Sequence, residues 1–520
     1  MTRTFYNGRI FTMGSNHPIA NYLTVSGDRI KDVGWSSGPF EKGIDLAGET
    51  VIPGIIDSHT HFVRYATQLL GGIDLGPAGS LEEALSIVSE DLSVESHESS
   101  NRWIRGGGWD KNVWPNDRFP TRGDLDSVIG DRPAAFFSRD CHAIWVNTRA
   151  LREAGIDRKT RAPLGGVIRR DTAGEPTGVL LDAAIDLVTP VIPPLSDEAM
   201  ISAVQRGIKF AASFGITGFV ACEGNDAFRV LSQMARNQSL DARVWLTIPH
   251  NTLNAVEALG LTGGWGNEFL QILGMKVMLD GSLGSQTAYL DAPYTSSKDG
   301  SFYGIKLVSE DELLALVRRA QEADLPAVLH AIGDAACEQA ISVLEQTGGA
   351  RLRHRLEHAQ LLRRDHPKRM RRLGVVASVQ PAHLCDDIPL IHRHWHDRSE
   401  RAYPLASLSE VGVRLAFGSD LPVAPLNPFL GIAQAAFRVD AEGQSWHPEQ
   451  RISVGAALEA YTLGSAYGVN SDHHLGILKP GAYADFVTLD RDPTKARTFG
   501  ELAETQVTGT WVAGKRVYPQ

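Results

Sequence analysis

The middle of the chain alternates between helical and extended patterns of hydrophobic residues. After Ser196, apolar residues from Ile201 to Ala211 recur at the spacing of one helical face. A second such pattern starts at Ser309, where Glu312 completes a capping box. Short apolar runs typical of buried strands separate these helices. Eight runs are predicted as strands: 51–57, 216–221, 243–248, 275–279, 326–329, 353–356, 375–379 and 413–417.

Strands that alternate with helices favour a parallel sheet, and eight of them favour a closed barrel. The expected fold class is therefore α/β, with a (β/α)8 TIM barrel over residues 51–71 and 196–469. A doubly wound open sheet is the alternative. In a barrel of this kind the chemistry lies at the C-terminal ends of the strands, so the residues that end each run deserve inspection.

Both ends of the chain carry short alternating strands broken by turns. Residues 4–13 have the pattern of a hairpin with a turn at Asn7-Gly8, and residues 506–518 turn again near Gly514. Because chain termini commonly lie close together, we expect residues 1–50 and 470–520 to form one small β-sandwich domain.

A long segment interrupts the alternation directly after the first predicted strand. Residues 72–195 are far more than a strand-to-helix connection needs, and they contain their own helix start at Ser80. We interpret this segment as an inserted subdomain or lid over the barrel mouth. A separate domain without a role at the site is the alternative.

Composition narrows the class of protein. The chain has 520 residues, a formal net charge of −10 and no basic excess, which argues against a nucleic-acid partner. Its four cysteines lie far apart without a CxxC pair, as in a reduced protein. Neither a signal peptide nor an apolar run of membrane-spanning length is evident. These features predict no membrane partner and a cytoplasmic location.

The predicted strand ends carry side chains that bind metals. His59 and His61 follow the first strand one residue apart, so both can point to one face of an extended backbone. Singly, a histidine at a strand end is more often a hydrogen-bonded core residue. Several such residues at the same end of one barrel favour a metal site instead. The later strands add Lys276 in the fourth, His330 after the fifth, His358 in the sixth and Asp420 after the eighth.

This constellation resembles the amidohydrolase superfamily of metal-dependent hydrolases, over nearly the whole chain. Three stretches look like its YtcJ-like branch, which includes N-substituted formamide deformylases: 140–147 (DCHAIWVN), 276–285 (KVMLDGSLGS) and 330–334 (HAIGD). The resemblance is specific for the branch, whereas it says little about any one substrate.

The resemblance implies a centre of two divalent ions, most often Zn²⁺. His59 and His61 would hold one ion with Asp420, and His330 and His358 would hold the other. Lys276 would be carboxylated, and its carbamate would bridge the ions. Physical chemistry agrees, because two cations would repel an ammonium group, so the lysine is either modified or holds no metal. A single-metal site stays open.

The same resemblance implies hydrolysis by metal-activated water, with Asp420 taking the proton and passing it to the leaving amine. His142, from the insertion, is a candidate donor to the oxyanion, as is the region from Asp280 to Ser282. For His142, a purely structural role is equally open. Three tryptophans of the insertion region could line an apolar pocket, namely Trp109, Trp114 and Trp145.

The favoured function is hydrolysis of a C–N bond in a small molecule, with an N-substituted formamide as the candidate substrate. The alternatives are a hydrolase of a cyclic amide, carbamate or ester, and a non-catalytic barrel that only binds. The complete ligand set argues against the last. Relatives are often oligomeric, so a homo-oligomer is possible, although no segment marks an interface.

Overall fold

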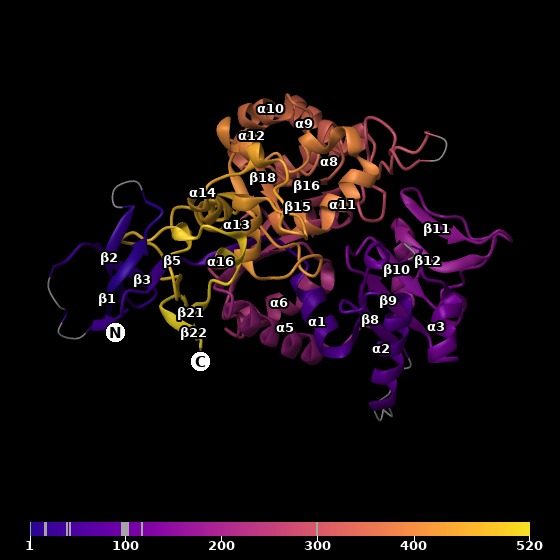
Figure 1. Ribbon diagram of the computed structural model, residues 1–520, viewed down its shortest axis with the longest axis horizontal. Helices are drawn as coiled ribbons and strands as arrows, with labels where there is room; N and C mark the ends of the chain where they lie inside the picture. Colours follow the sequence, from indigo (N-terminus) through magenta and orange to yellow (C-terminus); the bar gives the residue numbers. More distant parts are fainter. Residues whose placement is uncertain are drawn as a thin grey trace.

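The computed structural model describes residues 2–14, 18–37, 40, 43–94, 103–115, 118–297 and 300–519. The predicted domain ranges 1–50, 72–195, 196–469 and 470–520 each include positions outside the described residues. Three sheets organise the described chain. Figure 1 shows them in a row, with the barrel between a β-rich end and the insertion.

The central sheet is the predicted barrel. Its eight described strands are parallel, and each pairs with its neighbour in chain order. A parallel bridge from Thr60 to Leu421 brings the chain after the last strand against the end of the first. The order therefore excludes a doubly wound sheet. The strands are β6 (Ile55–Thr60), β13 (Ile216–Ala221), β14 (Arg243–Pro249), β15 (Leu270–Met278), β16 (Ala327–Ala331), β17 (Arg355–His358), β18 (Val376–Val379) and β19 (Leu415–Phe417).

Helices surround the barrel and bury the faces that the sequence pattern predicts. Ser309 caps α8 by accepting from the Glu312 N–H at 3.2 Å, and Ser196 caps α5 in the same way. The outer helices are α1 (Phe62–Gly71), α5 (Asp197–Ala212), α6 (Asn225–Arg236), α7 (Leu253–Ala258), α8 (Glu310–Glu322), α9 (Asp334–Thr347), α10 (His366–Leu373), α11 (Leu384–His394), α12 (Leu405–Glu410), α13 (Pro428–Phe437), α14 (Val454–Glu459), α15 (Ser465–Gly468) and α16 (Phe499–Ala503).

The first predicted strand, 51–57, is in fact two strands. β5 (Thr50–Pro53) pairs with strands from the two chain ends, and β6 begins the barrel after Gly54. A Cβ on Gly54 would lie 2.3 Å from the Thr217 Oγ1, so the close approach of β13 requires glycine here. One apolar run therefore serves two sheets.

The strands of both termini join in one sheet, in the order β22-β21-β20-β5-β1-β2-β3, with β4 beside β1. The predicted hairpin at Asn7-Gly8 is wrong: β1 runs through it with a shift in register, and Asn7 has a φ of 59°. The turn near Gly514 is correct. The strands are β1 (Thr2–Phe11), β2 (Ile19–Ser26), β3 (Arg29–Gly34), β4 (Gly43–Asp45), β20 (Phe486–Leu489), β21 (Val507–Val512) and β22 (Lys515–Tyr518).

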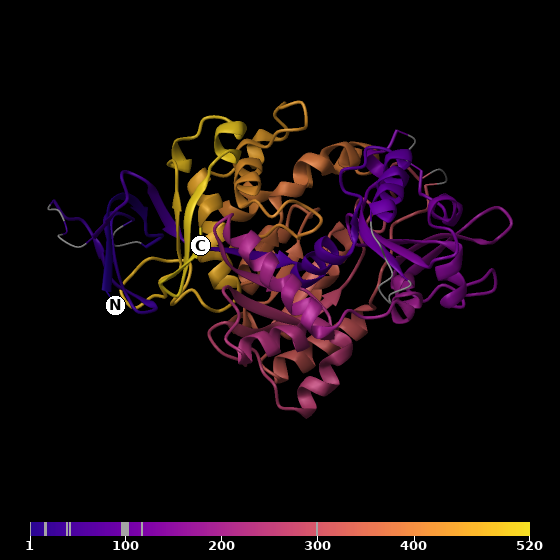
Figure 2. The same ribbon diagram turned by 90° about the horizontal axis from the view of Figure 1, so that it is seen from below.

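The insertion has its own sheet, in the order β11-β12-β10-β9-β8-β7, and its own apolar core. It lies at the opposite end of the barrel from the terminal strands (Figure 2). Its elements are β7 (Ile73–Asp74), α2 (Leu81–Val94), β8 (Ile104–Trp109), α3 (Arg122–Ile129), β9 (Ala134–Ser138), β10 (Ala143–Val146), α4 (Thr148–Glu153), β11 (Gly166–Arg170) and β12 (Pro176–Asp182).

Candidate metal centre and active site

Three side chains converge where the first and last barrel strands end. His59 lies in β6, His61 follows it, and Asp420 follows β19. The Asp420 Oδ1 lies 3.5 Å from the His59 Nε2 and 3.3 Å from the His61 Nε2. One possible ligand atom from each residue lies within 4.8 Å of the others. This spacing allows one cation to contact all three groups.

The surroundings of the Asp420 carboxylate fit a bound cation. Its Oδ1 is buried without a hydrogen-bond partner, although two imidazole nitrogens face it. Buried carboxylate oxygens are normally paired, and a divalent ion would satisfy this one. Burial lowers the pKa of His61 to about 4, which keeps its imidazole neutral, the form that binds metals.

His59 is oriented by a carboxylate that sequence reasoning missed. Its Nδ1 lies 2.5 Å from the Glu357 Oε2, and the Arg355 Nε donates to the other oxygen of Glu357 at 2.7 Å. Both Glu357 and Arg355 are fully buried. The carboxylate thus holds the imidazole with Nε2 toward the centre, as outer partners of metal-binding histidines do.

The other predicted ligands adjoin this cluster. The Lys276 Nζ lies 3.4 Å from the His59 Nε2, and the His358 ring centroid lies 4.9 Å from that of His59. His330 follows at 4.5 Å from His358. Its Nε2 faces the Gly281 carbonyl at 3.1 Å, which leaves Nδ1 for a ligand. The structure therefore brings all six predicted ligands together.

The chain around Asp420 is held against the first strand. Asp57 accepts from the Ser419 N–H at 2.9 Å, and the Asp420 N–H donates to the His59 carbonyl at 2.7 Å. A Cβ on Gly418 would lie 2.6 Å from the His59 nitrogen. The Gly-Ser-Asp stretch after β19 thus packs closely against β6, and this close approach requires a glycine at its first position.

The insertion delivers His142 to the same place. Its Nδ1 lies 2.6 Å from the Asp182 Oδ1, and its ring centroid lies 5.5 Å from that of His330. Burial alone would lower the pKa of His142, but the Asp182 carboxylate raises it to about 9. Asp280, by contrast, accepts from backbone N–H groups of the neighbouring chain, so its carboxylate organises loops.

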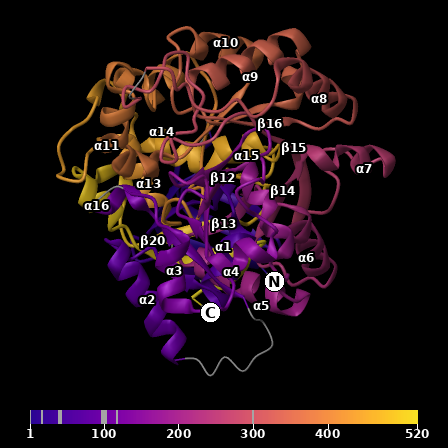
Figure 3. The same ribbon diagram turned by 90° about the vertical axis from the view of Figure 1, so that its right-hand side faces the viewer.

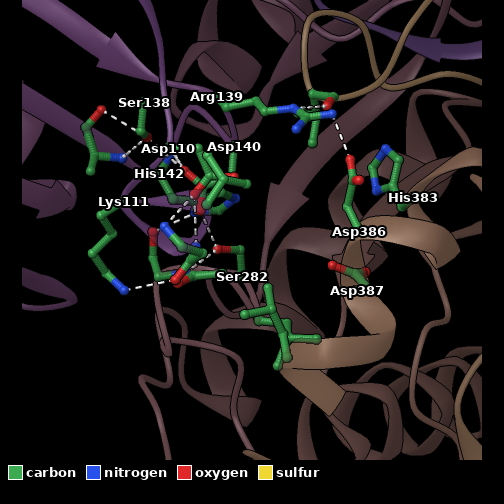
Figure 4. A pocket seen from close by; sticks show the side chains of 18 of the residues that line it. Asp110, Lys111, Ser138, Arg139, Asp140, His142, Ser282, His383, Asp386 and Asp387 are labelled. Atoms are coloured by element: carbon green, nitrogen blue, oxygen red, sulfur yellow. Dashed lines mark hydrogen bonds and ion pairs between the residues drawn. The ribbon is translucent and has the colours of Figure 1, made fainter. Parts of the chain in front are cut away.

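A cavity of about 240 Å³ lies between the insertion and the barrel mouth, beside His330, His358 and Asp420. Figure 3 looks from the insertion side, with β12, α3 and α4 in front. Figure 4 shows residues of the insertion on one side of the cavity and His383, Asp386 and Asp387 on the other. All three tryptophans pack in the core of the insertion, and of the three only Trp109 also lines the cavity.

Hydrogen bonds of two residues, Asp140 and Arg139, hold the insertion over the cavity. The Asp140 Oδ2 accepts from the Ser282 Oγ and the Ser285 Oγ, each at 2.7 Å. Arg139 donates to Asp386 at 2.6 Å and to the Val423 carbonyl at 3.0 Å. The insertion therefore builds part of the site, which the separate-domain alternative did not expect.

His383 and Asp387 are further cavity residues that sequence reasoning missed. The His383 Nε2 lies 3.0 Å from the Ser419 carbonyl, next to the Asp420 position. Asp387 accepts from the Gln360 Nε2 at 2.6 Å and from the Tyr403 hydroxyl at 2.5 Å. The available signal was that a histidine, His383, stands four positions after the end of the seventh barrel strand, β18.

Comparison with known proteins agrees with this geometry. The model of the amidohydrolase family matches residues 42–518. The chain belongs to the amidohydrolase family. It is 32% identical to the putative amidohydrolase YtcJ of Bacillus subtilis, over 95% of this chain and 93% of that protein. It is also 32% identical to the protein LONG AFTER FAR-RED 3 of Arabidopsis thaliana, over 99% and 91%.

Two further likenesses agree with the YtcJ-like branch of this family and with the fold. The N-substituted formamide deformylase of Arthrobacter pascens is 26% identical, over 98% of this chain and 96% of that enzyme. A solved metal-dependent hydrolase from Pyrococcus horikoshii is 28% identical with a TM-score of 0.78, covering 96% of this chain and 99% of that one. Among the described residues, none of the helices has the length and hydrophobicity of a membrane span.

Proposed function

We propose that this amidohydrolase cleaves the C–N bond of a small, neutral N-substituted amide, with N-substituted formamides as the favoured substrates. Two divalent ions, most simply Zn²⁺, would be held by His59, His61, His330, His358 and Asp420. Lys276 would join them as a carboxylated bridging ligand. A cytoplasmic location and a homo-oligomer stay predictions.

The observation that carries the proposal is the unpartnered, buried Oδ1 of Asp420 between two imidazole nitrogens. Divalent ions bound here would polarise the scissile carbonyl and activate water. The imidazoles around Asp420 keep its pKa well below the ordinary value in spite of burial. Its carboxylate is therefore ionised and able to accept a proton from the attacking water.

The same carboxylate can return the proton to the nitrogen of the leaving amine, which balances the hydrolysis of an amide to a carboxylic acid and an amine. His142 faces the reaction from the insertion side. With its Nδ1 bonded to Asp182, a protonated imidazole would present its Nε2–H to the oxyanion. Because Asp140 is bonded to Ser282 and Ser285, the insertion holds His142 at a fixed distance from the barrel.

The cavity favours a neutral substrate. Arg139 is paired with Asp386, and Lys111 donates to the Asn112 Oδ1 at 2.7 Å. Arg139 is therefore occupied by a carboxylate of the chain, whereas the bond to Asn112 engages only one N–H donor of Lys111, so the preference for a neutral substrate depends on the apolar walls. Apolar walls from Trp109, Phe119 and Leu390 suit a hydrocarbon substituent on nitrogen. The formamide deformylase relative supports this choice of substrate.

Metal analysis combined with a substrate screen tests the proposal. The screen takes N-benzylformamide, other N-substituted amides, hydantoins and esters, with Asp420→Asn as the matched control. We expect about two zinc ions per chain and release of amine from a formamide by the parent protein alone. Stable, metal-free protein isolated without chelators would refute the assignment as a metal-dependent hydrolase. Turnover of hydantoins, without amine from any formamide, would change the proposed substrate and keep C–N hydrolysis. Turnover of esters alone would keep only metal-dependent hydrolysis.

A further inference from the structure

A second cavity lies at the junction between the insertion and the barrel. Its volume is about 170 Å³, and it shares no lining residue with the cavity at the metal centre. Gly72 and Leu195 both line it, and these residues lie where the chain leaves the barrel for the insertion and where it returns. Strands β8 and β9 of the insertion form the facing wall. The cavity thus belongs to both units.

Arg64 brings a positive charge to this cavity. It lies in the first turn of α1, and its guanidinium carbon is 5.0 Å from the centroid of the Phe137 ring. Among the described residues, no carboxylate lies within ion-pair distance of its side chain, although the Cys141 thiol, Glu223 and Asp420 lie near enough to raise the pKa of Arg64 against the effect of burial. Glu223 itself accepts from backbone N–H groups of Val63 and Arg64.

Arg105, in β8, brings a second positive charge. One terminal nitrogen donates to the Pro193 carbonyl, and its Nε is buried without a hydrogen-bond partner. Burial lowers the pKa of Arg105, and no acidic neighbour opposes the effect. Two guanidinium groups therefore line one small cavity whose described lining contains no carboxylate.

We propose that this cavity is a binding site for a small organic carboxylate with a short apolar body. Arginine binds carboxylates through paired N–H donors, and a partly buried guanidinium without an anion has the most to gain from one. The remaining wall is mostly apolar, with Phe137, Ile192 and Leu195, which suits a hydrocarbon group better than a second charge. Inorganic phosphate would satisfy the arginines but not this wall.

The position of the cavity gives the ligand a structural consequence. A carboxylate bonded to Arg64 and Arg105 joins α1 of the barrel to β8 of the insertion. Because α1 begins directly after His61, the bound anion stiffens the junction next to the metal centre. Anion binding therefore reduces hydrogen exchange at Gly72 and Leu195 in the full-length protein.

Calorimetric titration of the metal-loaded, full-length protein with benzoate tests the site, with benzyl alcohol as the neutral analogue and phosphate as a second anion. Benzoate can also bind at a metal centre, so the difference between variants is the readout. We expect Arg105→Gln to weaken one class of benzoate sites about tenfold or more, through loss of a charged hydrogen bond. Arg158→Gln, an exposed arginine of the same insertion, leaves benzoate binding unchanged.

Two further variants keep the test decisive if Arg105→Gln folds poorly. Leu195→Phe fills the cavity while retaining both arginines, and it removes the same class of sites. Arg105→Lys retains the charge and part of the affinity. Benzoate binding that is equal in Arg105→Gln, Leu195→Phe and the parent protein overturns the proposal, as does equal binding of benzyl alcohol. Binding of phosphate without benzoate overturns the assignment to an organic carboxylate.

Discussion

The two ends of the barrel are closed by different kinds of contact. At the N-terminal ends of the strands, Arg243 of β14 forms a paired ion pair with Asp485, at 2.7 and 2.9 Å, with side chains 2% and 3% exposed. Next to it Val487 packs on Gly215. At the C-terminal ends, the insertion meets the barrel through separate polar contacts, and two cavities lie between them.

This difference between the contacts at the two ends agrees with a general property of the fold. Residues at the N-terminal face of the barrel contribute to stability, and residues at the C-terminal face carry the chemistry. A tightly buried ion pair leaves no donor or acceptor for a ligand. The looser face retains unsatisfied groups, such as the Oδ1 of Asp420 and the Nε of Arg105. Mutations at the two ends should therefore separate stability from function.

The largest effect is expected at the C-terminal end. Asp420→Asn removes the carboxylate that accepts the proton, so kcat should fall about 10²–10⁴-fold with a nearly unchanged melting temperature. Amine release from the substrate found by screening, together with metal content, measures this. Turnover of the variant at the parent rate would show that Asp420 has a structural role only.

The second-largest effect is expected at the N-terminal end of the barrel. Asp485→Asn leaves the buried guanidinium of Arg243 without a counter-charge, which should lower the free energy of unfolding by about 3–5 kcal/mol. Denaturant unfolding measures this loss. Turnover and metal content of the protein that remains folded should equal those of the parent. A large loss of kcat in folded, metal-loaded protein would break the division between the two ends.

Ligands could be predicted where they stand at the end of a strand that is recognisable from its apolar residues. His59, His330 and His358 are of this kind. Glu357 was not, although it precedes a predicted ligand, because its role depends on His59, 298 positions away in sequence. The split at Gly54 was hidden for a similar reason: the apolar run is continuous, and only the approach of Thr217 separates two sheets. Pairings across the barrel are set by tertiary contacts that no local pattern records.

A smaller effect is expected where the insertion is fastened over the cavity. Asp140→Asn weakens the bonds to Ser282 and Ser285, so His142 loses its fixed position above the barrel. We expect kcat/KM to fall about 10–100-fold, in line with the loss of charge-assisted hydrogen bonds, with little change in metal content. Ser285→Ala, which removes one partner only, should lose less. A loss of bound metal as large as the loss of kcat/KM would mean that Asp140 holds the metal-binding side chains in place.

The smallest effect is expected on the side of the barrel, away from both ends. Arg369 of α10 holds the pKa of Glu338 in α9 well below its ordinary value through hydrogen bonds at 2.8 and 3.0 Å. A carboxylate with a lowered pKa in the folded state stabilises the protein above the pKa of the unfolded chain, about 4.5, and loses this effect as the pH falls through the folded value. Glu338→Gln should therefore destabilise the protein by about 1 kcal/mol at pH 7 and by progressively less below pH 4.5. Urea unfolding of parent and variant across this range measures the difference, and turnover should stay at the parent level. A difference that grows toward acid pH would mean that another group stabilises this helix pair.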